Sequence, residues 1–258
     1  MSVKKLFDLS GRVAIVTGGS RGLGLQMAEA LGEMGAMLAL TARKRDELDS
    51  AVDHLAKLDV EASGWVCDVG KREQIPAVVD AILARYGRID VLLNNAGATW
   101  GAPAEDQPLD SWDKLVSVNL TGAFVMCQQV AKKAMIPAKG GRILITASTA
   151  GLTANDPRVM KTVAYNATKH GVVGMMRQMA AEWGIHGITV NAICPGVFPS
   201  KMSKSMIDAS GTAIIEATPT RRLGNEEDLK GLAVLLASDA SRQITGQAIA
   251  VDGGATII

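Results

Sequence analysis

Tyr165 and Lys169 are the residues of this sequence whose types and spacing most directly suggest chemistry. They are four positions apart, so a helix would place both side chains on one face, within reach of a shared site. A free phenol has a pKa of about 10 and exchanges protons poorly at neutral pH. A neighbouring ammonium group lowers that pKa and makes tyrosine usable as a general acid or base. The spacing alone is common by chance, and it also fits an ordinary pair of helical neighbours.

Regular elements alternate along the chain, and they must bring such a pair to a common site. Short aliphatic runs bounded by turn residues predict strands, and apolar residues at spacings of three and four predict helices. The expected strands are at 12–17, 37–41, 62–67, 89–94, 142–146, 188–193 and 248–251. The expected helices are at 22–34, 45–58, 72–86, 110–134, 164–183 and 226–237.

This alternation predicts an α/β fold. Strands that are buried on both faces and separated by helices indicate a doubly wound Rossmann fold, with a parallel sheet of about seven strands and helices on both faces. No linker, repeat or low-complexity stretch divides the chain, so we expect a single domain over residues 1–258. The least regular segment, 197–219, is a candidate substrate lid.

Composition argues against several classes of function. Lys and Arg total 27 against 26 Asp and Glu, without a basic stripe, so we expect no nucleic-acid partner. No signal peptide is recognisable and no run approaches about 18 apolar residues, so we expect no membrane association and a cytoplasmic location. The three cysteines and three histidines lack metal-ligand spacing, so no metal site is expected.

A glycine-rich loop, TGGSRGLG, follows the first expected strand at residues 17–24. Such a strand–loop–helix unit points backbone N–H groups and the helix dipole at a phosphate pair. The spacing departs from G-x-G-x-x-G, and a tight turn without a ligand is the alternative. The context favours a dinucleotide cradle made of Gly18, Ser20, Arg21, Gly22, Leu23 and Gly24.

The end of the second expected strand bears on which dinucleotide binds. An NAD site typically has an acidic residue there that hydrogen-bonds the ribose 2′-hydroxyl, whereas an arginine accommodates the 2′-phosphate of NADP. The sequence has Arg43 beside that position and no acid before Asp46, and Arg21 adds a second positive charge nearby. Lys44 and Arg45 also fit solvated charges at a helix start. We therefore expect NADP(H).

Further motifs follow later strands: Asn94-Asn95-Ala96-Gly97, Ser148, and Pro195-Gly196. All lie at the carboxyl ends of strands, where open α/β sheets bind ligands. Together with the glycine loop and the Tyr–Lys pair, in this order, they closely resemble the short-chain dehydrogenase/reductase family in its shorter, single-domain form. The resemblance extends from about residue 11 to residue 254. It implies hydride transfer between a nicotinamide cofactor and a small-molecule carbonyl/alcohol substrate.

The resemblance also implies roles for the matching residues. Tyr165 would donate the proton to the substrate oxygen, Ser148 would hydrogen-bond the same oxygen, and Lys169 would lower the pKa of Tyr165 and bind the nicotinamide ribose. Asn119 matches a helix asparagine that supports a water molecule and the lysine. The remaining cofactor positions are Asp68 and Val69 near the adenine, Asn95 on the adenosine ribose side with Ala96 and Gly97, and Pro195, Gly196, Val197 and Ser200 along the nicotinamide.

The substrate remains open between two classes. Segments 95–101 and 195–202 look like rhamnolipid-type 3-oxoacyl reductases of the family, and a thioester acyl chain would suit Met202, Met206 and Ile207. We favour this class. The alternative is a sugar-acid or polyol dehydrogenase resembling gluconate 5-dehydrogenase, in which Arg158 or Lys201 would meet a carboxylate.

Three further expectations concern the surroundings of the site. Sixteen residues separate Ser148 from Tyr165, more than in many relatives, so 152–163 should bulge over the substrate mouth, where Trp100 either touches substrate or simply packs. A sensor or scaffold without enzymatic activity would be marked by loss of Ser148, Tyr165 or Lys169, and all three are present. The family commonly forms tetramers through its two long helices, so we expect a homotetramer, with a dimer as the alternative.

Overall fold

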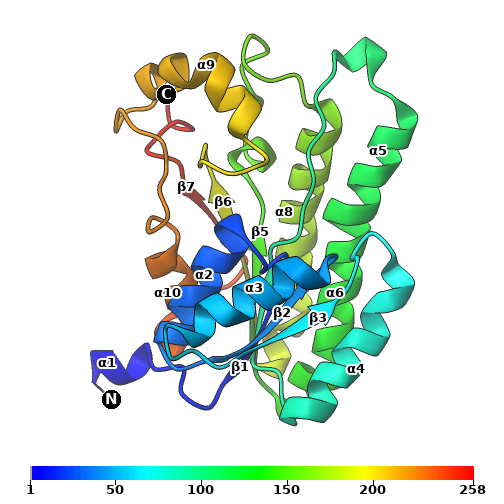
Figure 1. The fold of residues 1–258 in the computed structure, drawn as a ribbon, viewed down its shortest axis with the longest axis vertical. Helices are drawn as coiled ribbons and strands as arrows, with labels where there is room; N and C mark the ends of the chain where they lie inside the picture. The colour runs from blue at the N-terminus through cyan, green and yellow to red at the C-terminus, as the bar shows by residue number, and fades with distance from the viewer. Residues whose placement is uncertain (1) are drawn as a thin grey trace.

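The computed structural model describes residues 2–258 and contains a seven-stranded sheet in which neighbouring strands are parallel. The strands are β1 (Val13–Thr17), β2 (Met37–Ala42), β3 (Ala62–Val66), β4 (Val91–Asn94), β5 (Gly141–Thr146), β6 (Ile188–Pro195) and β7 (Ala248–Val251). Their order across the sheet is β3-β2-β1-β4-β5-β6-β7, so the direction of winding changes between β1 and β4. The predicted doubly wound fold is confirmed (Figure 1).

Two hydrophobic clusters cover the two faces of this sheet. One face packs against α2 (Gly22–Glu33), α3 (Arg45–Ala56) and α10 (Lys230–Ala237). The other packs against α4 (Ile75–Tyr86), α6 (Ala123–Val130) and α8 (Val163–Trp183). Because side chains alternate along a strand, neighbouring residues of β1 belong to different clusters.

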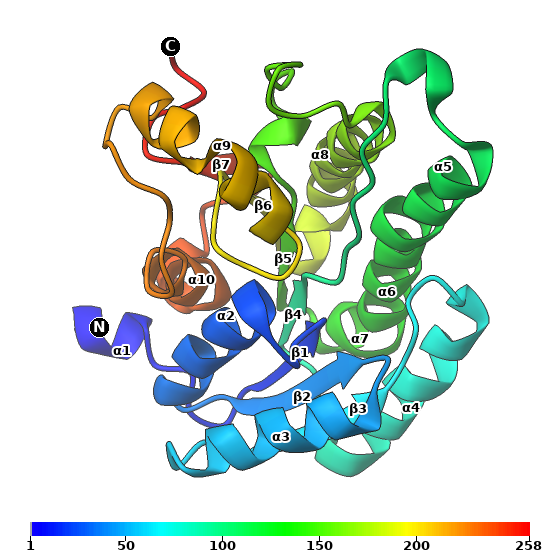
Figure 2. The ribbon, with the colours of Figure 1, turned by 45° about the horizontal axis from the view of Figure 1, so that its top comes forward.

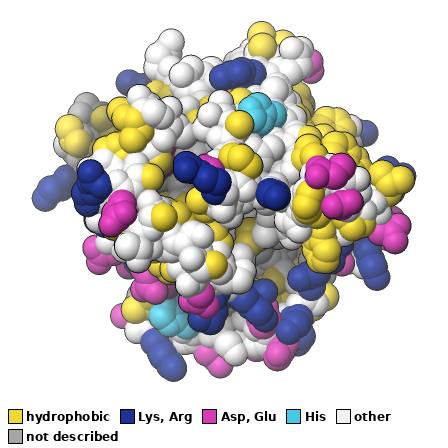
Figure 3. Space-filling view, turned by 90° about the horizontal axis from the view of Figure 1, so that it is seen from above, with side chains coloured by type: hydrophobic (Ala, Val, Ile, Leu, Met, Phe, Trp, Pro, Cys, Tyr) yellow, Lys and Arg dark blue, Asp and Glu magenta, His cyan; other side chains and the backbone are white. Residues whose placement is uncertain are grey.

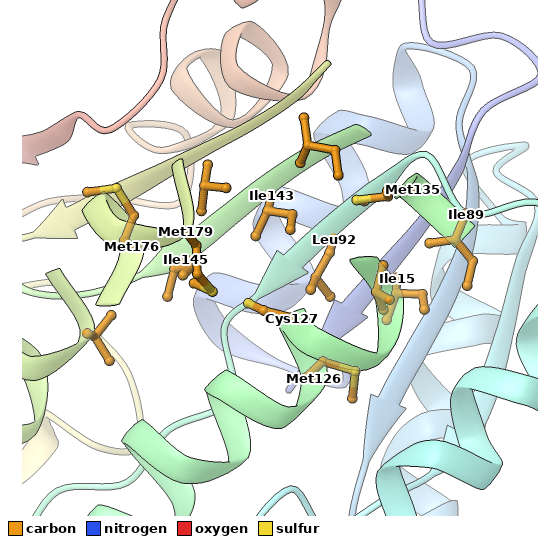
Figure 4. Packing of buried hydrophobic residues seen from close by; sticks show 14 of the residues in the cluster. Ile15, Ile89, Leu92, Met126, Cys127, Met135, Ile143, Ile145, Met176 and Met179 are labelled. Carbon is orange, nitrogen blue, oxygen red and sulfur yellow. The ribbon is translucent and has the colours of Figure 1, made fainter. Parts of the chain in front are cut away.

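Aliphatic and sulfur-containing side chains fill the core. Figure 4 shows Ile15, Leu92 and Ile143, from three adjacent strands, beside Met126 and Cys127 of α6. The chain has only nine aromatic residues, three Phe, four Trp and two Tyr, so flexible methionines occupy space that rings fill in other cores.

The helix expected at 110–134 is longer than predicted and irregular. It comprises α5 (Leu109–Leu115), α6 and α7 (Ile136–Ala138), joined by π-helical stretches at Val116–Gly122 and Ala131–Met135. Single π-turns inside α-helices often occur at functional sites. The first π-helical stretch contains Asn119, one of the predicted site residues.

Segment 197–219 contains a helix that the sequence analysis did not predict, α9 (Lys204–Ala217). Every residue of α9 keeps some exposure, so its apolar residues do not form the buried stripe on which helix prediction depends. Figures 1 and 2 show α9 above the sheet, on the side where β6 ends. A short helical turn, α1 (Val3–Leu6), was also not predicted. Within residues 2–258, no helix combines the length and apolar character that crossing a membrane requires.

Candidate active site

A cavity of about 770 Å³ lies at the carboxyl ends of the strands. Residues that follow β1, β2, β4, β5 and β6 line it, as expected where the winding of a parallel sheet changes direction. The predicted residues that line it are Gly18, Ser20, Arg21, Gly22, Leu23, Gly24, Arg43, Asp68, Val69, Asn95, Ala96, Gly97, Ser148, Tyr165, Lys169, Pro195, Gly196, Val197 and Ser200. Figure 3 views the molecule from above, the side of α9, where Lys and Arg side chains lie among hydrophobic ones.

The glycine loop forms a bare backbone cradle at the start of α2. Gly18 and Gly22 adopt φ angles of +63° and +55°, which favour glycine over other residues. A Cβ on Gly24 would come within 2.3 Å of the Gly18 carbonyl oxygen, so any side chain there would displace the loop. The cradle and the free N–H groups of the first helical turn fit the phosphates of a dinucleotide.

The end of β4 holds this cradle in place. The hydroxyl of Thr17 accepts hydrogen bonds from the backbone N–H groups of Asn95 and Ala96, both at 2.9 Å. The side-chain amide of Asn95 donates to the carbonyl oxygens of Thr17 and Gly18, at 3.2 and 3.4 Å. Asn95 therefore shapes the loop through its amide group, a contact that its place in the motif did not reveal.

Two arginines of the cavity differ in their partners. Arg21 forms an ion pair with Glu47 at 2.9 Å, and Lys44 approaches the same carboxylate at 3.2 Å. Arg43 is exposed at the end of β2, lines the cavity, and forms no ion pair within residues 2–258. Its guanidinium group is therefore available to an anionic ligand, whereas the charge of Arg21 is partly neutralised.

The predicted catalytic pair lies at the start of α8. The ammonium group of Lys169 stands 5.6 Å from the centroid of the Tyr165 ring and donates a 2.7 Å hydrogen bond to the carbonyl oxygen of Thr146, the last residue of β5. The Lys169 residue is only 4% exposed. A Cβ on Gly151 would lie 2.6 Å from the Lys169 carbonyl oxygen, so glycine is what allows the turn after β5 to approach the helix so closely.

Burial changes the proton affinities of this pair. Burial lowers the pKa of Lys169 to about 8, because the charged form loses its hydration. Burial likewise raises the pKa of Tyr165, while a hydrogen bond from Ser148 opposes the rise. Desolvation is thus the largest influence on the Tyr165 pKa in the free protein, and it acts against the lowering that a general acid of this kind needs.

Asn119 lies behind the cavity wall. Its Oδ1 accepts from the backbone N–H of Ala98 at 2.8 Å, and its Nδ2 donates to the Ala98 carbonyl at 2.9 Å and to the Thr168 hydroxyl at 3.1 Å. These bonds tie the loop after β4 to α8, one residue before Lys169. Through these contacts, Asn119 supports the loop after β4 and the start of α8.

Segment 152–163 lies along the cavity, and a parallel bridge between Ala102 and Thr162 joins it to the loop after β4. Arg158, one of the predicted carboxylate-binding groups, is 88% exposed at its side chain and bound to Asp156 at 2.6 Å, and it does not line the cavity. Trp100 is exposed and does not line it either. Lys201, the other predicted cation, does line the cavity, as do Met202 and Met206, whereas Ile207 does not.

Five residues of this segment line the cavity although none was predicted as a site residue: Asn155, Val159, Met160, Lys161 and Thr162. Their positions depend on how the segment folds back toward α8, for which the sequence offers no periodic signal. Among residues 2–258, no three His, Cys, Asp or Glu side chains are grouped so that they could hold a metal ion.

Comparisons with known proteins agree with this geometry. Residues 18–256 match the family model described as enoyl-(acyl carrier protein) reductase. The whole chain is 39% identical to D-threitol dehydrogenase of Mycolicibacterium smegmatis, covering 97% of that protein. A short-chain type dehydrogenase/reductase from Mycobacterium marinum superposes with a TM-score of 0.95 at 35% identity, and a gluconate 5-dehydrogenase from Burkholderia cenocepacia in complex with NADP and tartrate with 0.94 at 34%, each over 100% of both chains.

Lys169 should make stability depend on pH. With its folded pKa at about 8, below the ordinary 10.5, the unfolded chain binds more protons than the folded chain between these values. The free energy of unfolding should therefore rise with pH across that window. Relative to Lys169→Met, we expect the wild type to gain about 1–2 kcal/mol between pH 7.5 and 9.5, measured by urea denaturation of ligand-free protein.

The exposed Lys57 provides the control, because Lys57→Met should follow the wild type across the same pH range. Parallel pH profiles for the wild type and Lys169→Met would contradict the assigned pKa.

Proposed function

The chain belongs to the short-chain dehydrogenase/reductase family, and we propose that it is an NADP(H)-dependent oxidoreductase that interconverts a carbonyl group and a secondary alcohol. The observation that carries the proposal is the convergence of Ser148, Tyr165 and Lys169 on one cavity that also contains a glycine cradle. A sensor or scaffold without activity would not need all three groups at the same wall.

In this mechanism, the bound nicotinamide supplies the hydride in reduction and accepts it in oxidation. Tyr165 donates its proton to the carbonyl oxygen during reduction and takes it back in the reverse direction. The Ser148 hydroxyl hydrogen-bonds the same oxygen and holds it near the phenol. The raised pKa of Tyr165 keeps the phenol protonated in the free enzyme at neutral pH, which is the form that donates the proton in reduction.

Lys169 has two tasks in the mechanism. Its positive charge stabilises the phenolate that forms when Tyr165 gives up its proton. One of its three N–H donors is held by Thr146, which leaves the others to bind the nicotinamide ribose. Asn119 supports this arrangement through Thr168, the residue before the lysine.

For the cofactor, we assign the diphosphate to the glycine cradle, residues 18–24. Arg43 would bind the 2′-phosphate, since its guanidinium group is without an ion-pair partner in the described chain. Asp68 and Val69 would lie near the adenine, and Pro195 to Ser200 along the nicotinamide. The Burkholderia relative binds NADP, which agrees with this choice of dinucleotide.

Residues 1–258 would act as one domain, with 197–219 as a lid. The exposure along α9 supports this assignment, since few buried contacts restrain that helix. Lys201, Met202 and Met206 extend from the lid segment into the cavity wall, so its movement would admit and enclose the substrate.

Two substrate classes fit the cavity. The sequence analysis favoured a 3-oxoacyl thioester, and Met202 and Met206 offer an apolar wall for an acyl chain. A sugar acid or polyol is now the better candidate, because two of the compared relatives are named for a polyol and a sugar acid. Lys161 and Lys201 line the cavity and form no ion pair within residues 2–258, which suits a carboxylate.

We further propose a cytoplasmic homotetramer. Leu109, Phe124 and Val163 expose apolar surface on α5, α6 and α8, the helices through which the family commonly assembles. The three buried cysteines are all free thiols, as suits a reducing compartment.

Tyr165→Phe should remove the proton donor and leave the rest of the site intact. We expect kcat for NADPH-dependent ketone reduction to fall by roughly 10²- to 10⁴-fold, which is what general acid catalysis contributes. NADPH binding, followed by its fluorescence, should stay within about twofold of wild type, because the ring remains. The only other tyrosine provides a matched control. Tyr86 donates to Ser63 at the β3 edge, and Tyr86→Phe should leave kcat unchanged. Normal turnover by Tyr165→Phe would refute the mechanism.

Arg43→Ala should change the preference between cofactors. A charge-assisted hydrogen bond to the 2′-phosphate contributes about 1.5–3 kcal/mol, so kcat/KM with NADPH should fall about 10- to 100-fold while that with NADH stays nearly constant. Arg45→Ala is the control, because Arg45 already binds the Gly64 carbonyl and Asp49. Equal loss with both cofactors, or a wild type that prefers NADH, would rule out this role of Arg43.

A further inference from the structure

Three polar side chains fasten segment 152–163 to the start of α8. The Nδ2 group of Asn155 donates to the hydroxyl of Thr162 and to Oδ1 of Asn166, both at 3.0 Å. The Thr162 hydroxyl donates in turn to Oδ1 of Asn166 at 2.9 Å. Asn155 and Thr162 line the cavity, and Asn166 directly follows Tyr165 in the sequence.

The direction of each hydrogen bond is determined by a backbone carbonyl group. The carbonyl of Thr153 can only accept, so the Asn166 side chain must present Nδ2 to it, at 3.4 Å. This leaves Oδ1 of Asn166 as an acceptor, which takes its hydrogen bonds from Asn155 and Thr162. If the Asn155 amide were reversed, two amide oxygens would face each other at 3.0 Å. The Nδ2 group of Asn155 is therefore the end of the amide that points at Thr162 and Asn166.

The oxygen of the same amide is left for a ligand. Among residues 2–258, no group donates a hydrogen bond to Oδ1 of Asn155. This oxygen is also absent from the buried side-chain atoms that lack a partner, which belong to Gln26, Thr41, Gln107, Thr146 and Thr189. Oδ1 therefore keeps some exposure, on a residue that lines the cavity, and the hydrogen bonds of Nδ2 hold it as an acceptor.

We propose that Asn155 is a specificity-determining residue whose Oδ1 accepts a hydrogen bond from a hydroxyl group of the substrate, near the reacting carbonyl. This inference rests on the proposed oxidoreductase function and names its substrate class: polyhydroxylated carbonyl compounds and the corresponding polyols or sugar acids. A bound ketone without hydroxyl groups, or a bound 3-oxoacyl thioester, would cover Oδ1 of Asn155 without donating a hydrogen bond to it. Leaving a buried acceptor unsatisfied is unfavourable, so such substrates would react more slowly.

Two matched pairs of ketones test the proposal. 5-Ketogluconate and 5-oxohexanoate have the same six-carbon chain, ketone position and carboxylate, but 5-oxohexanoate lacks every hydroxyl group. Erythrulose and butan-2-one form an uncharged four-carbon pair. We expect the wild type, with NADPH, to show a kcat/KM at least tenfold higher for the hydroxylated member of at least one pair.

Two variants distinguish recognition of the substrate by Asn155 from structural support of segment 152–163. For each pair, we compare kcat/KM for the hydroxylated ketone with kcat/KM for the ketone that lacks hydroxyl groups. In Asn155→Ala this ratio should fall about tenfold, mainly because kcat/KM for the hydroxylated ketone decreases. Thr162→Val removes two hydrogen bonds of the fastening, those of its hydroxyl with Asn155 and Asn166, and leaves Oδ1 of Asn155 in place, so it should lower both rates together and preserve the ratio. If Asn155 only fastens the segment, both variants will preserve the ratio, and the proposal is overturned.

The remaining outcomes distinguish this inference from the proposed function. The role of Asn155 would be overturned if the wild type preferred the ketones that lack hydroxyl groups. It would also be overturned if the wild type reduced acetoacetyl-CoA but neither hydroxylated ketone. Either result would leave the oxidoreductase assignment intact. Absence of NADPH oxidation with all five compounds, by a protein that binds NADPH, would count against both.

Discussion

The hydrogen bond from the Lys169 ammonium group to the Thr146 carbonyl oxygen is the interaction on which the site depends. Lys169 is only 4% exposed, so its charge requires a partner, and here the partner is the end of strand β5. The bond therefore fixes α8 against the sheet at the level where ligands bind. It also helps to position Tyr165, which lies one helical turn earlier on α8.

Hydrogen bonds and short backbone segments connect Lys169 with the glycine loop. Thr168, beside the lysine, is bound by Asn119, which holds both backbone groups of Ala98. Three residues earlier in the same loop, Asn95 holds the carbonyl groups at the end of β1. The groups that would bind the cofactor and those that would transfer the proton are thus parts of one rigid framework. Asn119 belongs to this framework although it does not line the cavity.

The strands and most helices were predictable because burial on both faces of the sheet imposes strong periodic patterns. The helix α9 was not, because it keeps exposure along its length and its sequence carries no buried stripe. The residues named for the site were found through motifs at strand ends, since topology brings those ends together. Asn155 and Lys161 belong to a segment whose path is set by tertiary contacts, and Arg158 was a wrong candidate because Asp156, two residues away, binds it. The pKa of Tyr165 likewise depends on burial, which the four-residue spacing does not encode.

Framework and specificity are therefore carried by different parts of the molecule. Groups on the strand ends and on α8 are those that the proposed reaction would require for any carbonyl compound, so they would not distinguish one substrate from another. Discrimination must come from the rest of the cavity wall, to which segments 152–163 and 197–219 contribute many residues. Within these segments, Asn155 is the residue for which a role in substrate discrimination is best supported, because its amide is oriented before any ligand binds. An acceptor held by two hydrogen bonds loses little conformational freedom on binding, and a substrate without a matching hydroxyl cannot make it turn away.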